Sequence, residues 1–304
     1  MAEFIHDLQS YRFLGEVLSV GSGFVWAIAV LLFRVSGKSV HPLGLNLFKN
    51  VLATGLIIIT MLLLGDPLIH QAPWQDYLLV ALSGVIGIAI SDTLFFYCLN
   101  LLGAGLTAIV DCLYSPFVIL FSILFIGEKM ALRQVIGVIL ILSAVLLVSQ
   151  KKEDGTPSRK NLSLGIGVGT LAMVTMAGGI VMIKPLLDSA PVLWVILLRM
   201  GTATIVLTGF LAFHPRRGPI CRPLAVLSHW RIMVPSAILG AFLGNIAWIA
   251  GMKLTKASVA APLNQLNTIF IFILAAIFLS EKVTKGKIIA VILATIGAIL
   301  VSWP

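Results

Sequence analysis

Charged residues are scarce in this sequence. Asp, Glu, Lys and Arg make up 11% of its 304 residues, whereas 59% are hydrophobic. Soluble domains usually carry about 25% charged and about 45–50% apolar residues. Because about 20 apolar residues cross a bilayer as a helix, roughly ten spans would use about 200 residues of this chain. The composition therefore predicts an integral membrane protein with no separate soluble domain, and it argues against a cytosolic enzyme, a nucleic-acid-binding protein and a single-span receptor.

Motifs for metal binding, disulfide formation and nucleotide binding are absent. Cys98 and Cys112 lie in apolar runs and Cys221 stands alone in a basic loop, so no disulfide or metal-ligand spacing is visible. The five histidines fall at span ends or in loops, and none belongs to an HExxH pair. No Walker sequence is present, so ATP is not expected to drive an activity directly. We therefore expect no cofactor, no metal site and no enzymatic activity. The acidic N-terminal segment also predicts no signal peptide.

Ten apolar segments are bounded by charges, Pro and Gly. They are Val17 to Phe33, Leu43 to Leu64, Tyr77 to Leu99, Gly105 to Ile126, Val135 to Val148, Leu162 to Ile183, Val192 to Phe213, Ile232 to Met252, Ser258 to Leu279 and Ile288 to Val301. Backbone groups in hydrocarbon must be hydrogen-bonded within the protein, and these runs are too long for barrel strands. We predict ten transmembrane helices. The fifth and tenth segments are short enough that a re-entrant or interfacial segment is the alternative.

A polar linker over residues 150–161 divides the chain into a first half, residues 1–149, and a second half, residues 162–304. Sliding the halves by 153 residues places residues 84–149 on residues 237–302 without a gap, with 16 of 66 positions identical. The matches include Glu128 with Glu281. Each half holds five segments, and five is odd, so the second half must cross the membrane in the opposite direction. The sequence thus predicts two inverted five-helix repeats, which is the architecture of secondary transporters.

The pattern resembles a known family. GEK (Gly127–Lys129) and SEK (Ser280–Lys282) follow the fourth and ninth segments, and the stretch from Tyr97 to Gly137 combines a mid-helix Pro with an apolar run and a Gly-Glu-basic ending. These features resemble the EamA family of the drug/metabolite transporter superfamily. The resemblance covers essentially the whole chain, although Lys49 stands where the family usually has Arg and Ile269 replaces the Pro that matches Pro116. It implies a transporter of amino acids, related metabolites or drugs.

Only four of the 33 charged residues lie well inside the predicted spans: Lys49, Asp92, Asp111 and Arg199. A charge at mid-helix costs at least about 2.5–3.5 kcal/mol on insertion scales, so such residues normally face a cavity or a partner. They are the first candidates for substrate binding or coupling.

Asp111 is the most central of these charges. It shares one predicted helix face with Thr107, Tyr114, Ser115 and Ser122. The corresponding stripe in the ninth span contains Asn264, Asn267 and Thr268. Two polar stripes at matching heights in inverted halves would form the walls of a central pocket. The alternative is that these side chains only hydrogen-bond between helices.

The other candidates each have an alternative role. Asp92, opposite Asn245 in the eighth span, suits either a proton-coupling site or an ion pair with Lys49 or Arg199. Lys49 and Arg199 lie within two to three turns of their helix starts, where snorkelling or structural pairing is expected. If they face a cavity, they favour a substrate carboxylate or phosphate.

Aromatic and acidic residues complete the candidates. Trp26, Tyr97 and Trp248 suit stacking on a ligand, although packing is the commoner use of aromatic residues in spans. For Glu128 and Glu281 we expect a structural role, ending a helix and pairing with a nearby base.

These observations predict a secondary transporter in the cytoplasmic membrane that exports a small polar metabolite by alternating access. Proton coupling through Asp92 or Asp111 is a hypothesis, and no nucleic acid is expected as a partner. An uncoupled facilitator or a channel is the alternative, with a membrane-embedded enzyme less favoured. Orientation has two opposed predictions. The side without the termini carries thirteen Lys and Arg against six, which places the termini outside, whereas the family resemblance implies termini inside.

Overall fold

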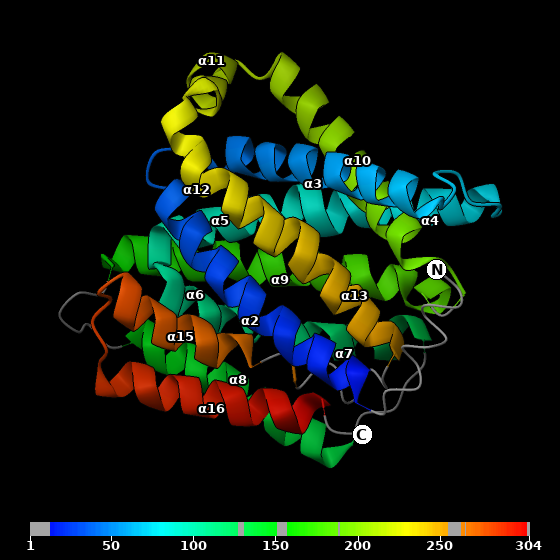
Figure 1. Cartoon of the computed structure of the whole chain (residues 1–304). Coiled ribbons are helices and arrows are strands. Elements are labelled where there is room, and N and C mark those ends of the chain that lie inside the picture. Colours follow the sequence, from blue (N-terminus) through cyan, green and yellow to red (C-terminus); the bar gives the residue numbers. More distant parts are fainter. Residues whose placement is uncertain are drawn as a thin grey trace.

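The computed structural model describes residues 13–126, 131–150, 157–187, 189–254, 263–264 and 266–302, and this part of the chain is helical without a strand. The first half contains α2 (Leu14–Ser36), α3 (Pro42–Leu64), α4 (Trp74–Gly84), the π-helix η1 (Val85–Ile90), α5 (Ser91–Leu102), α6 (Ala104–Asp111), α7 (Tyr114–Ile126) and α8 (Leu132–Gln150). The second half contains α9 (Arg159–Leu187), α10 (Val192–Phe213), α11 (Arg217–Cys221), the 3-10 helix η2 (Arg222–Ala225), α12 (Leu227–Ala237), the π-helix η3 (Ile238–Gly244), α13 (Asn245–Leu254), α15 (Asn267–Phe278) and α16 (Lys285–Ser302). Figure 1 shows these helices layered across one another.

Several helices suit a bilayer. Within the described residues, seven are long and apolar enough to cross a membrane: Leu14–Ser36, Pro42–Leu64, Trp74–Leu102, Ala104–Phe125, Arg159–Leu187, Val192–Phe213 and Leu227–Gly251. Two shorter apolar helices, Leu132–Leu147 and Asn267–Phe278, fall in the fifth and ninth expected segments. Large apolar side chains also point outward, with Phe213 91% and Leu63 82% exposed. Such a surface is disfavoured in water and suits lipid. The chain is a multi-pass membrane protein, and the count of ten spans stays a prediction.

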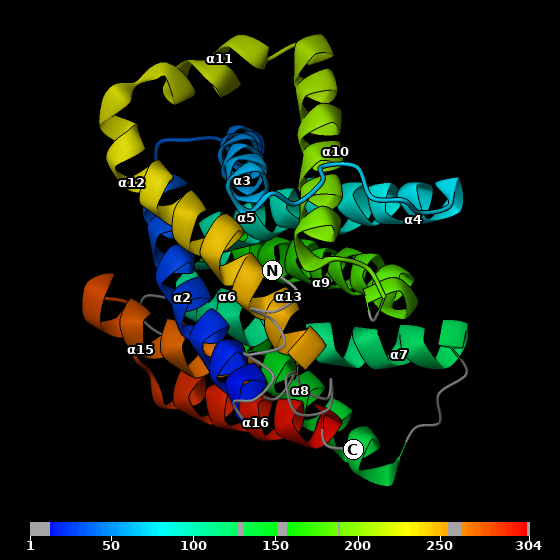
Figure 2. The same cartoon turned by 45° about the vertical axis from the view of Figure 1, so that its right-hand side comes forward.

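The two halves have matching local structure. The π-helix η1 begins at Val85 and η3 begins at Ile238, which is the same 153-residue offset that aligns the sequences. The packing corresponds as well, because α2 contacts α13 and α15 of the second half, while α9 contacts α5 and α7 of the first. The last helices of the two halves, α8 and α16, pack against each other, as Figure 2 shows near the C-terminus. The two halves therefore pack closely against each other through corresponding helices.

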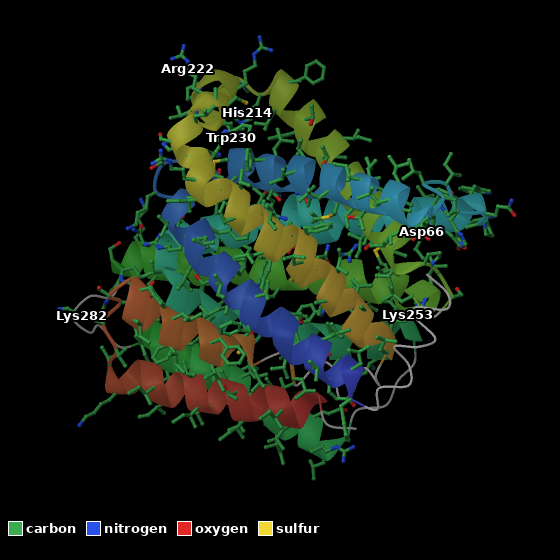
Figure 3. The ribbon with its side chains drawn as sticks, viewed as in Figure 1. Asp66, His214, Arg222, Trp230, Lys253 and Lys282 are labelled. Carbon is green, nitrogen blue, oxygen red and sulfur yellow. The ribbon has the colours of Figure 1, made fainter. Side chains whose placement is uncertain are left out.

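The halves run in opposite directions. The first turns of α2 lie at the end of α13, because a β-carbon at Gly251 would lie 2.7 Å from the Ser19 hydroxyl. The end of α9 lies at the same end of the bundle, because the Lys253 ammonium donates a hydrogen bond to the carbonyl of Ala190, just beyond α9. Thus α2 begins where α9 ends. Figure 3 shows Lys253 and Asp66 on one side of the bundle and Lys282 on the opposite side.

The fourth predicted span is broken into two helices. Its turn at Cys112 and Leu113 separates α6 from α7. Pro116 lacks a backbone N–H and cannot bond the carbonyl of Cys112, so the α-helical hydrogen-bond ladder is interrupted there. The break places Asp111 at the end of α6 and Tyr114 at the start of α7. The helix expected to carry a continuous polar stripe from Thr107 to Ser122 is therefore interrupted between Asp111 and Tyr114. The corresponding Pro262 lies outside the described residues.

Candidate functional site

A cavity lies at the centre of the bundle, where both halves contribute to its wall. Its volume is about 130 Å³. That space would admit on the order of ten waters. The buried apolar side chains of the protein form two clusters, and residues of both line the cavity: Trp26, Phe95 and Met176 from one, and Ile88, Ile180 and Met200 from the other. The cavity is thus a mixed apolar and polar site between the packed layers.

Most of the residues singled out from the sequence meet at this cavity. The lining includes Lys49, Asp92, Asp111, Tyr114, Arg199, Asn245, Trp248, Asn264 and Asn267. Among the polar candidates, Ser115 and Thr268 do not line it. Ser115 is buried outside the wall, and Thr268 is fully buried. The Thr268 hydroxyl has two acceptors in range for its single hydrogen, the Asn267 side-chain oxygen at 3.2 Å and the carbonyl of Ala108 at 3.5 Å. For Thr268, bonding between helices replaces the expected cavity position.

Lys49 and Asp92 form an ion pair in the cavity wall. The Lys49 Nζ lies 2.6 Å from Asp92 Oδ2, and both residues are buried. Asn46 supports this pair from one turn earlier in α3. Its amide donates to the carbonyls of Ile88 and Ala89, both at 3.1 Å, and to the Thr93 hydroxyl at 2.9 Å. The π-helix before Asp92 therefore has its carbonyls held by α3, which fixes the position of the carboxylate. π-Helical turns often occur at functional sites.

Arg199 reaches the cavity without a carboxylate partner. It is 5% exposed, and its Nε has no hydrogen-bond partner within the described ranges. Glycine makes room for it, because a β-carbon at Gly84 would lie 2.3 Å from the Arg199 carbonyl and one at Gly87 would lie 3.1 Å from Arg199 Nη2. Both basic residues are buried and line the cavity. Lys49 forms the structural ion pair that the sequence allowed, whereas Arg199 faces the cavity without an ion pair among the described residues.

Asp111 lies across the repeat interface from two asparagines. Asn267 donates to Asp111 Oδ2 at 3.5 Å, the long end of the hydrogen-bond range. Asn264 donates to the Ser22 hydroxyl at 2.8 Å. These bonds connect α6 with α15 and α2 with the segment before α15. The carboxylate of Asp111 is therefore held by one amide and faces the cavity without an ion-pair partner among the described residues.

Two aromatic candidates lie in different places. Trp248 lines the cavity from α13. Tyr97 instead bonds His41 at the start of α3, with 2.9 Å between the Tyr97 hydroxyl and His41 Nε2. His41 Nδ1 also accepts the Leu43 N–H at 3.3 Å and so caps α3. Burial and the nearby His214 lower the pKa of His41. Tyr97 thus anchors the entry of α3 and takes no part in the cavity.

Glu281 has a different structural role from the one expected. Its carboxylate accepts the backbone N–H groups of Ala104 at 2.7 Å and Gly105 at 3.0 Å. A carboxylate at a helix N-terminus satisfies otherwise unpaired donors and interacts favourably with the helix dipole. Pairing of Glu281 with a base is therefore wrong among the described residues, since it caps α6 of the opposite half. Glu128 lies outside the described residues.

The sequence reasoning missed Ser22 and Met176, which also line the cavity. Ser22 and Trp26 are four residues apart, so both lie on one face of α2. That spacing is a signal that could have identified Ser22. Met176 is one apolar residue among many in α9, and nothing in the local sequence distinguishes it.

Helices suited to a bilayer, two matching halves that run in opposite directions and a polar cavity between them define a membrane protein of the transporter class. Comparison with known proteins supports this class. The EamA-like transporter family matches residues 13–150 and again residues 163–303. The chain therefore belongs to the EamA-like transporter family, and it is a membrane transport protein.

Individual relatives are distant but cover nearly the full length. An uncharacterized transporter of Archaeoglobus fulgidus is 23% identical over 95% of this chain and 98% of its own length. An uncharacterized transporter of Synechocystis sp. is 25% identical over 92% of this chain and 86% of its own length. A crystal structure aligns with a TM-score of 0.69 at 19% identity, covering 94% of this chain and 95% of the other. At that identity the likeness concerns the fold alone.

Proposed function

We propose that this protein is a secondary transporter of the cytoplasmic membrane that binds a small polar metabolite in the central cavity and exports it by alternating access. One observation carries the proposal: two acidic and two basic residues, from four different helices and both halves, line one central cavity. Buried charges in a membrane protein are costly and usually mark a substrate or ion pathway. Inverted repeats around a midplane site can exchange conformations so that the site faces each side in turn.

The resemblance to the EamA family supports amino acids, related metabolites or drugs as the substrate class. We propose Asp111 and the Lys49–Asp92 pair as the groups that would couple transport to protons. The ion pair between Lys49 of α3 and Asp92 of α5 joins these two helices at 2.6 Å, so breaking it offers a route by which coupling could change their packing.

Counterflow in proteoliposomes tests the proposal. A thermal-shift screen of the purified protein first identifies a compound that binds, because a ligand at 100 times its dissociation constant should stabilise the folded state by about 2.7 kcal/mol. Vesicles are then loaded with the unlabelled compound and uptake of the labelled compound is followed. A carrier accelerates this uptake. Passage without counterflow would indicate a channel, and chemical conversion of the compound would indicate an enzyme. Either result would contradict the proposal.

We also propose ten spans arranged as two inverted five-helix repeats. Five spans would separate Glu128 from Glu281, so the two positions must lie on opposite sides of the membrane. Single cysteines placed next to each, in a background lacking Cys98, Cys112 and Cys221, should react with an impermeant reagent from opposite faces. Reaction from the same face would show that a span is miscounted, and the short fifth segment would be the first to re-examine.

A further inference from the structure

Arg199 is a basic residue of the cavity wall that forms no ion pair with the described residues. Lys49 is neutralised by Asp92 at 2.6 Å. Arg199 lies within electrostatic range of Asp92, but that carboxylate is already paired with Lys49. No carboxylate lies within ion-pair distance of Arg199 in the described part of the chain, and its buried Nε lacks any acceptor there. A buried charge without a partner is strongly unfavourable. The guanidinium also presents a planar set of donors that matches a carboxylate or phosphate. This arrangement is suited to an anionic group that arrives with a ligand.

Asp111 is an acidic residue of the same cavity wall that likewise forms no ion pair with the described residues. Asp111 has only the long Asn267 contact of 3.5 Å, and no base in the described ranges lies within ion-pair distance. Tyr114, at the start of α7, lies within electrostatic range of both Arg199 and Asp111. The two unpaired charges therefore face one space without contacting each other.

We propose that Arg199 binds the anionic group and Asp111 the cationic group of one transported compound, so that the cavity selects small zwitterions. The inference rests on the proposed function and names the recognition chemistry of the same site. A zwitterion would neutralise both unpaired charges at once, whereas a compound with a single charge would leave the other one buried and unpaired. The site should therefore discriminate strongly against compounds that lack either charge.

The remaining wall defines where the rest of such a compound would lie. Trp26 and Phe95 pack together with their ring centroids 6.0 Å apart, and Trp248 lines the cavity from α13. Met176 and Ile180 of α9 add further apolar surface. An apolar substituent of the compound would pack against these side chains while its charged groups bind Arg199 and Asp111. Removing the apolar surface of the substituent from water is favourable in proportion to the area buried.

Binding measurements on the detergent-purified protein test the proposal. The twenty protein amino acids, glycine betaine and taurine are screened as zwitterions by isothermal titration calorimetry. For each amino acid that binds, its methyl ester supplies a cation without the carboxylate and its N-acetyl derivative supplies an anion without the ammonium. We expect each derivative to bind the wild-type protein about 10- to 100-fold more weakly than the amino acid, the loss expected when a charge-assisted hydrogen bond is removed.

Two variants should change this preference in opposite ways. Arg199→Gln should lose the preference for the amino acid over its methyl ester and keep the preference over the N-acetyl derivative. Asp111→Asn should show the reverse. Arg216→Gln, which removes an exposed arginine outside the cavity wall, is the matched control and should leave all affinities unchanged. If Arg199→Gln fails to fold, Arg199→Lys retains the charge without the planar fork and should bind more weakly with the preference intact.

The outcomes separate this inference from the proposed function. Equal wild-type affinity for an amino acid and its methyl ester, the same loss for all compounds in both variants, or no binding by any zwitterion would overturn the inference. The expected preference without counterflow of the bound compound would instead contradict transport and leave the recognition chemistry standing. Counterflow of a compound that carries only one charge would support transport and overturn zwitterion selection.

Discussion

The ion pair between Lys49 and Asp92 can be tested quantitatively by a double-mutant cycle. At a separation of 2.6 Å, the attraction between unit charges is about 6 kcal/mol if the effective dielectric constant is about 20. Removing both charges from water offsets most of this attraction, so the net contribution of the pair is small. Breaking the pair is different. Lys49→Met alone leaves the buried Asp92 carboxylate without its partner, and Asp92→Asn alone leaves the buried Lys49 ammonium without its partner. We expect Lys49→Met to destabilise the protein by about 3–5 kcal/mol.

The double variant should recover most of that loss, because it removes the uncompensated carboxylate. We expect its stability to lie within about 1 kcal/mol of the wild type, since buried pairs replaced by neutral groups are often nearly neutral. Unfolding of the detergent-solubilised protein by SDS, followed by circular dichroism, measures these differences. Lys38→Met, at an exposed position after α2, is the control and should change stability by less than about 0.5 kcal/mol. Wild-type stability of Lys49→Met, or additive losses in the double variant, would refute the reasoning.

Four further predictions concern transport, packing, pH and orientation. Asp111→Asn should abolish or severely slow counterflow while expression stays intact, because losing a charge inside a span eases insertion; normal transport at several pH values would exclude Asp111 from binding and coupling. Glu281→Ala should lower the stability of the protein by about 1.5–3 kcal/mol for each charge-assisted hydrogen bond to the α6 N-terminus. Gly103→Ala should also destabilise the protein, because Gly103 has φ 84° and a β-carbon there would lie 2.7 Å from Glu281 Oε1. Unchanged SDS unfolding midpoints would contradict the cap. The lowered pKa of His41 means that the unfolded chain binds the proton more readily, so stability should be full above pH 6.5 and fall as the pH drops below it; His41→Asn, which keeps a capping acceptor without titrating, should reduce that fall. A reporter active only in the cytoplasm should be silent when fused after Pro304, as the loop charges predict; a bright reporter would place the C-terminus inside.

The sequence by itself determined the class of the protein and its main divisions. The length of an apolar run indicates a membrane-spanning helix because the thickness of the bilayer sets that length for each helix, independently of its neighbours. The 153-residue offset predicted the repeat, and the π-helices at Val85 and Ile238 follow the same offset. The scarcity of charge in the spans drew attention to Lys49, Asp92 and Arg199, since the cost of an intramembrane charge depends on depth rather than on the fold.

Only the tertiary structure decided how these residues are used. The base that pairs with Asp92 depends on the distance between α3 and α5. The spacing of residues within either helix does not predict that distance. The pairing with Lys49 leaves Arg199 without an ion-pair partner among the residues that the structure describes. Glu281 likewise reaches backbone donors 176 and 177 residues away. Hydropathy and spacing describe one helix at a time, whereas ion pairs, caps and cavity walls arise from helices that are distant in sequence and adjacent in space.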